Sequence, residues 1–172
     1  FSNGMKSIDG MPSVLSGIPM FIEPFFLTPS SLNTVSSIGG ELGKKGYYTA
    51  FFHGADNGSM GFEAFARTAG YTHYFGRTEY NEANPDNKDF DGHWGIWDEK
   101  FFQFFGNTLS GFQQPFAAAL FSLSSHHPFA VPAEYEGVFP KGNKPIRQCI
   151  GYTDNALKLF FEKVSKEPWY KN

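Results

Sequence analysis

The chain has 172 residues, enough for one domain with a substantial core. Its apolar content of 41% and aromatic content of 19%, with 21 phenylalanines, exclude a disordered chain and predict an aromatic-rich core. A formal net charge of −3 excludes the basic surface of a nucleic-acid-binding protein. The single cysteine, Cys149, excludes an internal disulfide and a multi-cysteine metal site, and we expect it to be a small buried side chain.

The first half of the chain alternates predicted helices with one buried strand. We expect a short helix over 11–18, a helix from about 31 to 42, a strand over 47–52 and another short helix over 58–69. The second of these helices would place four apolar residues on one face: Leu32, Val35, Ile38 and Leu42. The third would turn three residues inward: Phe62, Phe65 and Ala66.

In the second half, residues 78–92 are polar and predict a mobile surface loop, and 97–109 predict a helix. The run 116–123 is apolar on both faces, as a central parallel strand is. A proline- and glycine-rich excursion over 128–143 precedes the longest predicted helix, 145–166. Its apolar face is expected to consist of Ile146, Ile150, Thr153, Leu157, Phe160, Phe161 and Val164.

This alternation of helices and buried strands predicts an α/β fold. We expect a single domain over 1–172 with three layers, in which helices flank a predominantly parallel sheet. The alternative is a compact α+β domain with a small antiparallel sheet.

Two short segments that contain histidine follow directly on the two predicted strands. His53 comes at the end of the first, and His126 and His127 come just after the second. Ligands of open α/β sheets bind beyond the carboxyl ends of the strands, so histidines from both strands can meet one anionic ligand there. Adjacent residues point to opposite sides of an extended chain, and we expect His127 to be peripheral. The alternative is that these histidines are packed or solvated structural residues.

The other histidines give little support for a metal site. His73 and His93 fall in predicted loops and are expected at the surface. No His-x-x-x-His pair occurs, and Cys149 offers no cysteine partner, so the zinc signal is weak.

Four strings that occur in this order resemble one enzyme family. They are Phe-Phe-His-Gly-Ala-Asp-Asn-Gly-Ser-Met-Gly-Phe over 51–62, Trp-Gly-Ile-Trp-Asp-Glu over 94–99, Leu-Ser-Ser-His-His-Pro-Phe over 123–129, and Cys-Ile-Gly-Tyr-Thr-Asp over 149–154. Together they resemble the lipoteichoic-acid-synthase-type phosphoglycerol transferases, which are sulfatase-like members of the alkaline phosphatase superfamily. The likeness is strongest to the Gram-negative branch.

The resemblance implies substrate-binding residues. His53 matches the histidine of the family's Phe-His-Gly element, and His126 matches that of its (Ser/Thr)-(Ser/Asn)-His-x-Pro-(Phe/Tyr) element. Asp56 is similar to the acidic residue that follows Phe-His-Gly, and Trp94 is expected at the mouth of the site. Gram-positive members carry a Trp and an Arg shortly after Phe-His-Gly, whereas this chain has Met-Gly-Phe over 60–62.

The resemblance also implies a nucleophile and a divalent metal. In the family a threonine attacks a phosphodiester and also binds the ion, for which Mn²⁺ is expected first and Mg²⁺, Zn²⁺ or Ca²⁺ are alternatives. The matching region, 1–9, contains no threonine, and Ser2, Asn3 or Ser7 takes its place. Asn3 cannot act as a nucleophile. Ser2 is therefore the first candidate for nucleophile and metal ligand, with Ser7 as the alternative.

The family's remaining metal ligands would lie before residue 1 and after residue 172. We therefore expect these residues to be the middle of a catalytic domain, which alone binds metal weakly, has little turnover and exposes apolar surface that favours self-association.

The expected function is a metal-dependent phosphoglycerol transferase, or a phosphodiester or sulfate-ester hydrolase, acting on lipid- or glycan-linked anionic groups. The partner would be an anionic small molecule or a phospholipid headgroup, and no nucleic acid. No Cys-x-Pro-x-Arg or Ser-x-Pro-x-Arg element occurs, which favours phosphodiester over sulfate-ester chemistry. The family further implies an upstream membrane anchor and a place at the periplasmic face of the inner membrane. The alternative is a non-catalytic module that binds anionic ligands.

Overall fold

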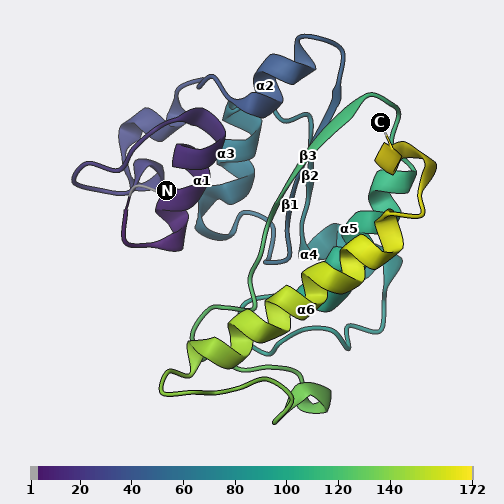
Figure 1. Cartoon of the computed structure of the whole chain (residues 1–172). Helices are drawn as coiled ribbons and strands as arrows, with labels where there is room; N and C mark the ends of the chain where they lie inside the picture. The colour runs from purple at the N-terminus through teal and green to yellow at the C-terminus, as the bar shows by residue number, and fades with distance from the viewer. Residues whose placement is uncertain (1–3, 172) are drawn as a thin grey trace. The chain divides into compact units, whose positions relative to one another are not determined.

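The computed structural model describes residues 4–171, and these residues form two compact units. Unit 1 contains residues 4–52, 57–75 and 113–121, and unit 2 contains 53–56, 76–112 and 122–171. Figure 1 shows the course of the chain through both units.

A three-stranded sheet confirms the predicted α/β class. Its strands are β1 (Tyr48–His53), β2 (His73–Phe75) and β3 (Phe116–Phe121), in the order β2-β1-β3. β1 and β2 are parallel, with Phe51 opposite Tyr74. The Tyr48 N–H donates to the Pro115 carbonyl oxygen at 2.9 Å, so β3 begins beside the start of β1 and runs in the same direction.

The position of β3 corrects one prediction. Within the described sheet it is an edge strand, and all six of its residues are half-buried rather than buried. β2 was not predicted, because three residues are too few to show the alternation that marks a strand.

Unit 1 contains three α-helices and three short 3₁₀ turns. The helices are α1 (Ser7–Ser16), α2 (Ile38–Gly43) and α3 (Phe62–Thr68); the turns are η1 (Phe25–Leu27), η2 (Pro29–Leu32) and η3 (Ser59–Gly61). Figure 1 draws α1 and α3 close together. Their side chains share one core with the sheet, made up of Ile8, Met11, Phe51, Phe62, Phe65, Ala66, Ala69, Tyr71 and Tyr74.

The predicted helix over 31–42 is wrong in its first half, because α2 begins only at Ile38. The cause is Ser37, whose buried hydroxyl accepts a hydrogen bond from the Gly40 N–H at 3.0 Å and donates to the Ala69 carbonyl at 2.5 Å. This serine caps the helix and fixes its start against the end of α3. Leu32 and Ile38 are consequently exposed and form no buried face.

Unit 2 contains α4 (Arg77–Ala83), α5 (Asp98–Ser110) and α6 (Ile146–Val164), with 3₁₀ turns η4 (Ala133–Tyr135) and η5 (Pro168–Lys171). The prediction of a loop over 78–92 is therefore wrong for its first part. α4 forms because the Glu79 carboxylate accepts the Gly76 N–H at 2.6 Å at its amino end, and because Tyr80 is buried. Of the helices within 4–171, none is both long and apolar enough to cross a membrane.

α5 and α6 pack side by side and form the core of unit 2 (Figure 1). They approach closely because Gly106 has no side chain: a Cβ there would lie 3.1 Å from Val164 Cγ1. The rings of Phe105 and Phe160 stack with their centroids 5.3 Å apart.

The longest helix was predicted almost to its ends, but its buried face was not. The buried residues are Cys149, Tyr152, Ala156, Phe160 and Val164. Of the predicted face, Ile150, Leu157 and Phe161 are exposed, by 54%, 39% and 48%. The helix carries two neighbouring apolar stripes. The buried stripe is the one that contains the small residues Cys149 and Ala156, which allow α5 to approach. Cys149 is buried, as predicted.

Candidate functional site

The predicted histidines occupy the ends of neighbouring strands. His53 is the last residue of β1, and His126 lies five residues beyond the end of β3, which is the strand next to β1. Both belong to unit 2, together with Asp56 and Trp94. His53 is buried, with 5% of its surface exposed, whereas the side chains of His126 and His127 are exposed.

Gly54 follows His53 and Gly95 follows Trp94, and the close packing of these two glycines explains why each string has a glycine there. Gly54 and Gly95 pack backbone against backbone, and a Cβ on Gly95 would lie 2.2 Å from the Gly54 carbonyl oxygen. That oxygen accepts the Ile96 N–H at 2.9 Å, and Ala55 forms an antiparallel bridge with Gly95. The chain after His53 is thereby joined to the chain after Trp94.

A buried carboxylate joins three of the strings. Asp98, which is 2% exposed, accepts hydrogen bonds from the Leu123 N–H at 2.8 Å, the Ser124 N–H at 3.1 Å and the Thr153 hydroxyl at 2.9 Å. The Asp98 N–H in return donates to the Ser124 hydroxyl at 2.9 Å. Burial raises the pKa of Asp98, and these hydrogen bonds oppose that shift because they stabilise the ionised form.

Asp98 therefore fixes the start of the turn that carries His126. The turn closes with a hydrogen bond from the His126 N–H to the Leu123 carbonyl at 3.1 Å. The two residues between Leu123 and His126 also contact helices. Ser124 donates to Asp98 of α5, and the Ser125 hydroxyl lies 3.4 Å from the Thr153 hydroxyl of α6. The hydrogen bonds of Asp98 to Leu123, Ser124 and Thr153 were not predicted from the sequence, because the spacing of the strings along the chain does not show which strings contact one another.

Trp94, which was expected at the mouth of the site, lies against His126. The centroids of the two rings are 4.2 Å apart, and the Trp94 indole N–H donates to the His127 carbonyl at 2.5 Å. The His126 Nδ1 lies 3.1 Å from the same carbonyl oxygen. The hollow beside these rings, also lined by Asp91 and Trp97, has a volume of about 10 Å³, room for a water molecule.

Asp56 has a partner that the sequence analysis missed. Its exposed carboxylate accepts from the Arg77 guanidinium at 3.1 Å. The Arg77 guanidinium also lies over the Phe90 ring, 3.8 Å from its centroid, and the backbone N–H of Arg77 donates to the Ala55 carbonyl at 3.0 Å. Asp56 thus holds a cation beside the Phe-His-Gly string. Arg77 opens α4, a helix that was predicted as loop, so no signal singled it out.

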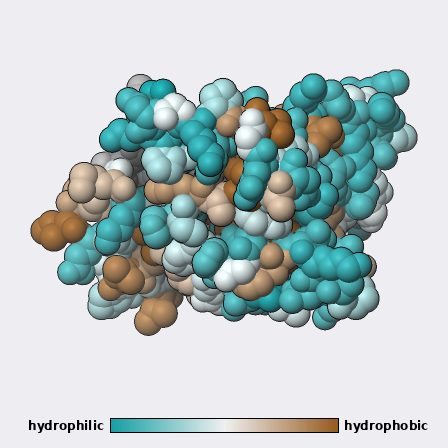
Figure 2. Space-filling model, turned by 90° about the horizontal axis from the view of Figure 1, so that it is seen from below, coloured by the Kyte–Doolittle hydropathy of each residue, from teal (hydrophilic) through white to brown (hydrophobic). Residues whose placement is uncertain are grey.

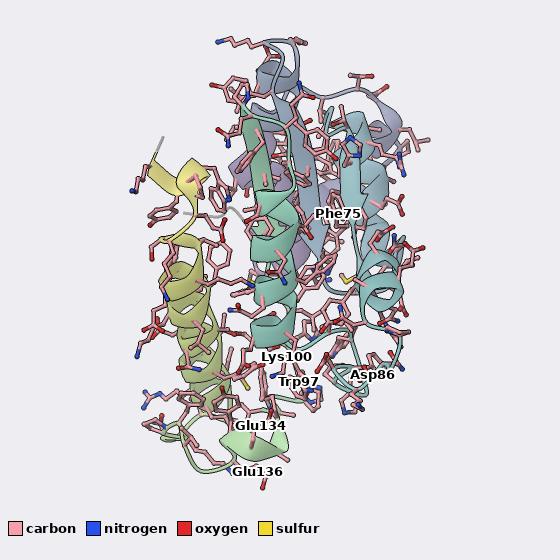
Figure 3. The ribbon with its side chains drawn as sticks, turned by 90° about the vertical axis from the view of Figure 1, so that its right-hand side faces the viewer. Phe75, Asp86, Trp97, Lys100, Glu134 and Glu136 are labelled. Carbon is pink, nitrogen blue, oxygen red and sulfur yellow. The ribbon has the colours of Figure 1, made fainter. Side chains whose placement is uncertain are left out.

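The amino end of α5 carries a further set of charged and phenolic groups. Figure 3 shows Trp97 and Lys100 there, above Glu134 of η4. Glu99 accepts from the Lys100 ammonium at 2.9 Å and from the Tyr135 hydroxyl at 2.5 Å. The bond to Glu99 raises the pKa of Tyr135, because the phenol donates to a carboxylate.

Of the candidate nucleophiles, Ser2 and Asn3 lie outside the described residues, and Ser7 is the exposed first residue of α1 in unit 1. Asp9 in the first turn is buried, and its Oδ2 accepts the Lys6 N–H at 3.1 Å. Over 4–171, no three His, Cys, Asp or Glu side chains lie close enough to hold a metal ion. These residues therefore do not fit a complete metal site.

The fold defines the class of protein to which this chain is similar. A protein of the alkaline phosphatase superfamily from Vibrio parahaemolyticus superposes on 98% of the chain with a TM-score of 0.84 and 24% identity, and 41% of that protein is covered. The lipoteichoic acid synthase LtaP from Listeria monocytogenes superposes on 96% of the chain with a TM-score of 0.79 and 21% identity, again over 41% of its own length.

The sequence gives the family itself. The sulfatase family model matches residues 1–172, and the chain belongs to the sulfatase family. Lipoteichoic acid synthase 2 of Bacillus subtilis (strain 168) is 28% identical over 146 aligned positions, gaps included, and the match covers 80% of this chain and 21% of that protein. Phosphoglycerol transferase I of Escherichia coli (strain SMS-3-5 / SECEC) is 26% identical over 182 aligned positions, gaps included, and the match covers 96% of this chain and 23% of that protein. The chain thus spans about a fifth of the length of these curated relatives.

Proposed function

We propose that this chain provides the substrate-binding part of an enzyme that transfers phosphoglycerol, or cleaves a related phosphodiester, from a lipid- or glycan-linked donor. Two kinds of evidence support the proposal. The chain belongs to the sulfatase family and is similar to proteins named phosphoglycerol transferase and lipoteichoic acid synthase. In addition, Asp98 and Trp94 hold His126 on a fixed turn, which follows β3 in the chain.

The observation that carries the proposal is the exposed His126 ring on this anchored turn. Such a ring can donate a hydrogen bond to a phosphoryl oxygen, and more strongly when it is protonated. His53 and Arg77 are the other proposed donors, with Asp56 orienting Arg77 rather than touching an anionic substrate. Phosphate oxygens prefer charge-assisted N–H donors, so this set suits an anionic ester.

In the proposed reaction a serine hydroxyl, from Ser2 or Ser7, attacks phosphorus. The new phosphorus–oxygen bond forms as the bond to the lipid alcohol breaks, and that alcohol takes up the serine proton. The oxygen of an acceptor hydroxyl then attacks phosphorus, the bond between phosphorus and the serine oxygen breaks, and the acceptor's proton returns to the serine. The divalent ion that the family implies has no complete set of ligands among residues 4–171, so no step is assigned to it.

Binding of glycerol phosphate to this 172-residue chain tests the proposal without requiring turnover. We expect glycerol phosphate to shift the NMR signals of the His126 ring, and His126→Ala to weaken binding by roughly tenfold, the scale of one charge-assisted hydrogen bond. His73→Ala is the matched control, because His73 stacks on Tyr48 in unit 1.

Equal binding by both variants, or shifts at His73 in place of His126, would contradict the assignment. In the complete enzyme, His126→Ala or His53→Ala is expected to lower the rate by about 10²-fold, the scale for one transition-state donor. Metal content should not change. Binding without turnover in the complete protein would instead favour the alternative of a non-catalytic ligand-binding module.

A further inference from the structure

Trp94 is exposed and yet held by hydrogen bonds. Apolar side chains are exposed in several places on the surface, brown in Figure 2, and scattered exposure of this kind is normal in proteins. Trp94, which is 40% exposed, differs because both its backbone and its indole are hydrogen-bonded. The backbone bond is made by Asp91, a half-buried residue that also lines the hollow beside the Trp94 and His126 rings. Asp91 is therefore placed to act on Trp94 and, through it, on His126.

One oxygen of Asp91 closes the loop that carries Trp94. Its Oδ1 accepts three consecutive backbone N–H groups, from His93 at 2.8 Å, Trp94 at 2.7 Å and Gly95 at 3.0 Å. The Asp91 N–H in return donates to the Gly95 carbonyl at 2.8 Å. Three donors that share one acceptor leave the backbone between them little freedom, because a different course would leave at least one of them without this partner. Asp91 thus fixes where the Trp94 side chain leaves the loop.

The Trp94 side chain crosses to the turn that contains His126. Its indole N–H donates to the His127 carbonyl at 2.5 Å, and the centroids of the Trp94 and His126 rings are 4.2 Å apart. The His126 Nδ1 lies 3.1 Å from the same carbonyl oxygen. A carbonyl oxygen only accepts hydrogen bonds, so this contact requires a proton on Nδ1. A neutral imidazole has one N–H, and the lone pair is therefore on Nε2.

We propose that Asp91 is a positioning residue for His126. Asp91 fixes Trp94, and the Trp94 indole fixes the His127 carbonyl. That carbonyl keeps the neutral His126 ring protonated at Nδ1 and leaves Nε2 for the substrate. There Nε2 accepts a hydrogen bond from a glycerol hydroxyl when the ring is neutral and donates one to a phosphoryl oxygen when the ring is protonated. The identity of that substrate rests on the proposed function, whereas the state of the ring can be measured without a ligand.

Nitrogen NMR of the ligand-free 172-residue chain shows which ring nitrogen of His126 carries the proton. At about pH 9, above the range in which histidine titrates, we expect Nδ1 to carry it. Asp91→Ala should shift the proton toward Nε2, and so should Trp94→Phe, which keeps an aromatic ring but has no N–H. Asp91→Asn should behave as the wild type, because a single amide oxygen can replace Oδ1 as the acceptor. Asp86→Ala is the matched control, since Asp86 is an exposed aspartate of the same connection between α4 and α5 and pairs with Lys88.

Glycerol phosphate binding then tests the link to the substrate. We expect Asp91→Ala to weaken it by about three- to tenfold, no more than loss of the His126 ring itself. In a His126→Ala background the same substitution should have no further effect, because Asp91 acts through that ring. A purely structural role would instead weaken binding by the same factor in both backgrounds.

Circular dichroism and thermal unfolding establish that the variants are folded, and Trp94→Phe tests the same link if Asp91→Ala does not fold. A His126 proton that stays on Nδ1 in Asp91→Ala and Trp94→Phe, or an equal shift in Asp86→Ala, would overturn the proposal. A loss of binding that is the same with and without the His126 ring would also overturn it. Absence of glycerol phosphate binding by the wild-type chain would contradict the proposed function, and the state of the ring alone would then decide the role of Asp91.

Discussion

Asp98 shows at the scale of one residue how a structural side chain supports a functional one. The sequence placed it inside the Trp-Gly-x-Trp-Asp string but offered no reason for a carboxylate there. In the structure its two oxygens satisfy two backbone N–H groups and the Thr153 hydroxyl, all at the start of the His126 turn. Exposed motif residues such as His126 could be read from the sequence, whereas a buried positioning residue became visible only through its hydrogen bonds.

Replacing Asp98 with Asn should destabilise the fold. Asn keeps the size but has one acceptor oxygen, and its NH₂ group would face N–H donors, leaving at least one buried donor unpaired. We expect the free energy of unfolding in urea to fall by about 1–3 kcal/mol. Asp154→Asn, at an exposed site one residue beyond Thr153, is the control and should change it by less than about 0.5 kcal/mol. Equal stability of the two variants would show that Asp98 does not hold the turn.

At the scale of elements, periodicity predicted where helices and strands lie better than which face they bury. The strands over 47–52 and 116–123 and the last helix were found within two residues of their observed ends. The buried face of α6 was missed because apolar residues occur on both stripes, and the choice between them depends on α5, through Gly106. α2 was overextended for a similar reason, since the cap that starts it is completed by the distant Ala69 carbonyl.

The close approach of α5 and α6 can be tested by filling the space at Gly106. Gly106→Val should lower the free energy of unfolding by about 1–3 kcal/mol, because its branched side chain would overlap Val164 and Phe160. Val164→Ala makes room, so the double variant should be more stable than the sum of the two single effects predicts. Gly111→Ala, where the nearest atom to a Cβ is 3.5 Å away, is the control. Additive effects of the two substitutions would argue against this contact.

At the scale of the whole molecule, the order of four strings was more informative than composition or any single motif. The structure places most of these strings in unit 2, where Gly54 meets Gly95 and Asp98 meets Ser124 and Thr153. Residues far apart in the chain are therefore kept together because they pack on one another. The strings did not reveal Arg77, because it is part of none of them and its pairing with Asp56 forms only in three dimensions.

We also predict how strongly the 172-residue chain binds a divalent metal ion. The candidate ligands Ser2 and Ser7 carry neutral hydroxyls, which hold a divalent ion poorly without several carboxylates or imidazoles around it. We therefore expect calorimetric titration with Mn²⁺ to give only weak binding, without a one-to-one end point below millimolar metal, and Ser7→Ala to leave it unchanged. Mg²⁺ should behave alike. Tight one-to-one binding of Mn²⁺ that Ser7→Ala abolishes would refute this expectation and would identify Ser7 as part of a working metal site.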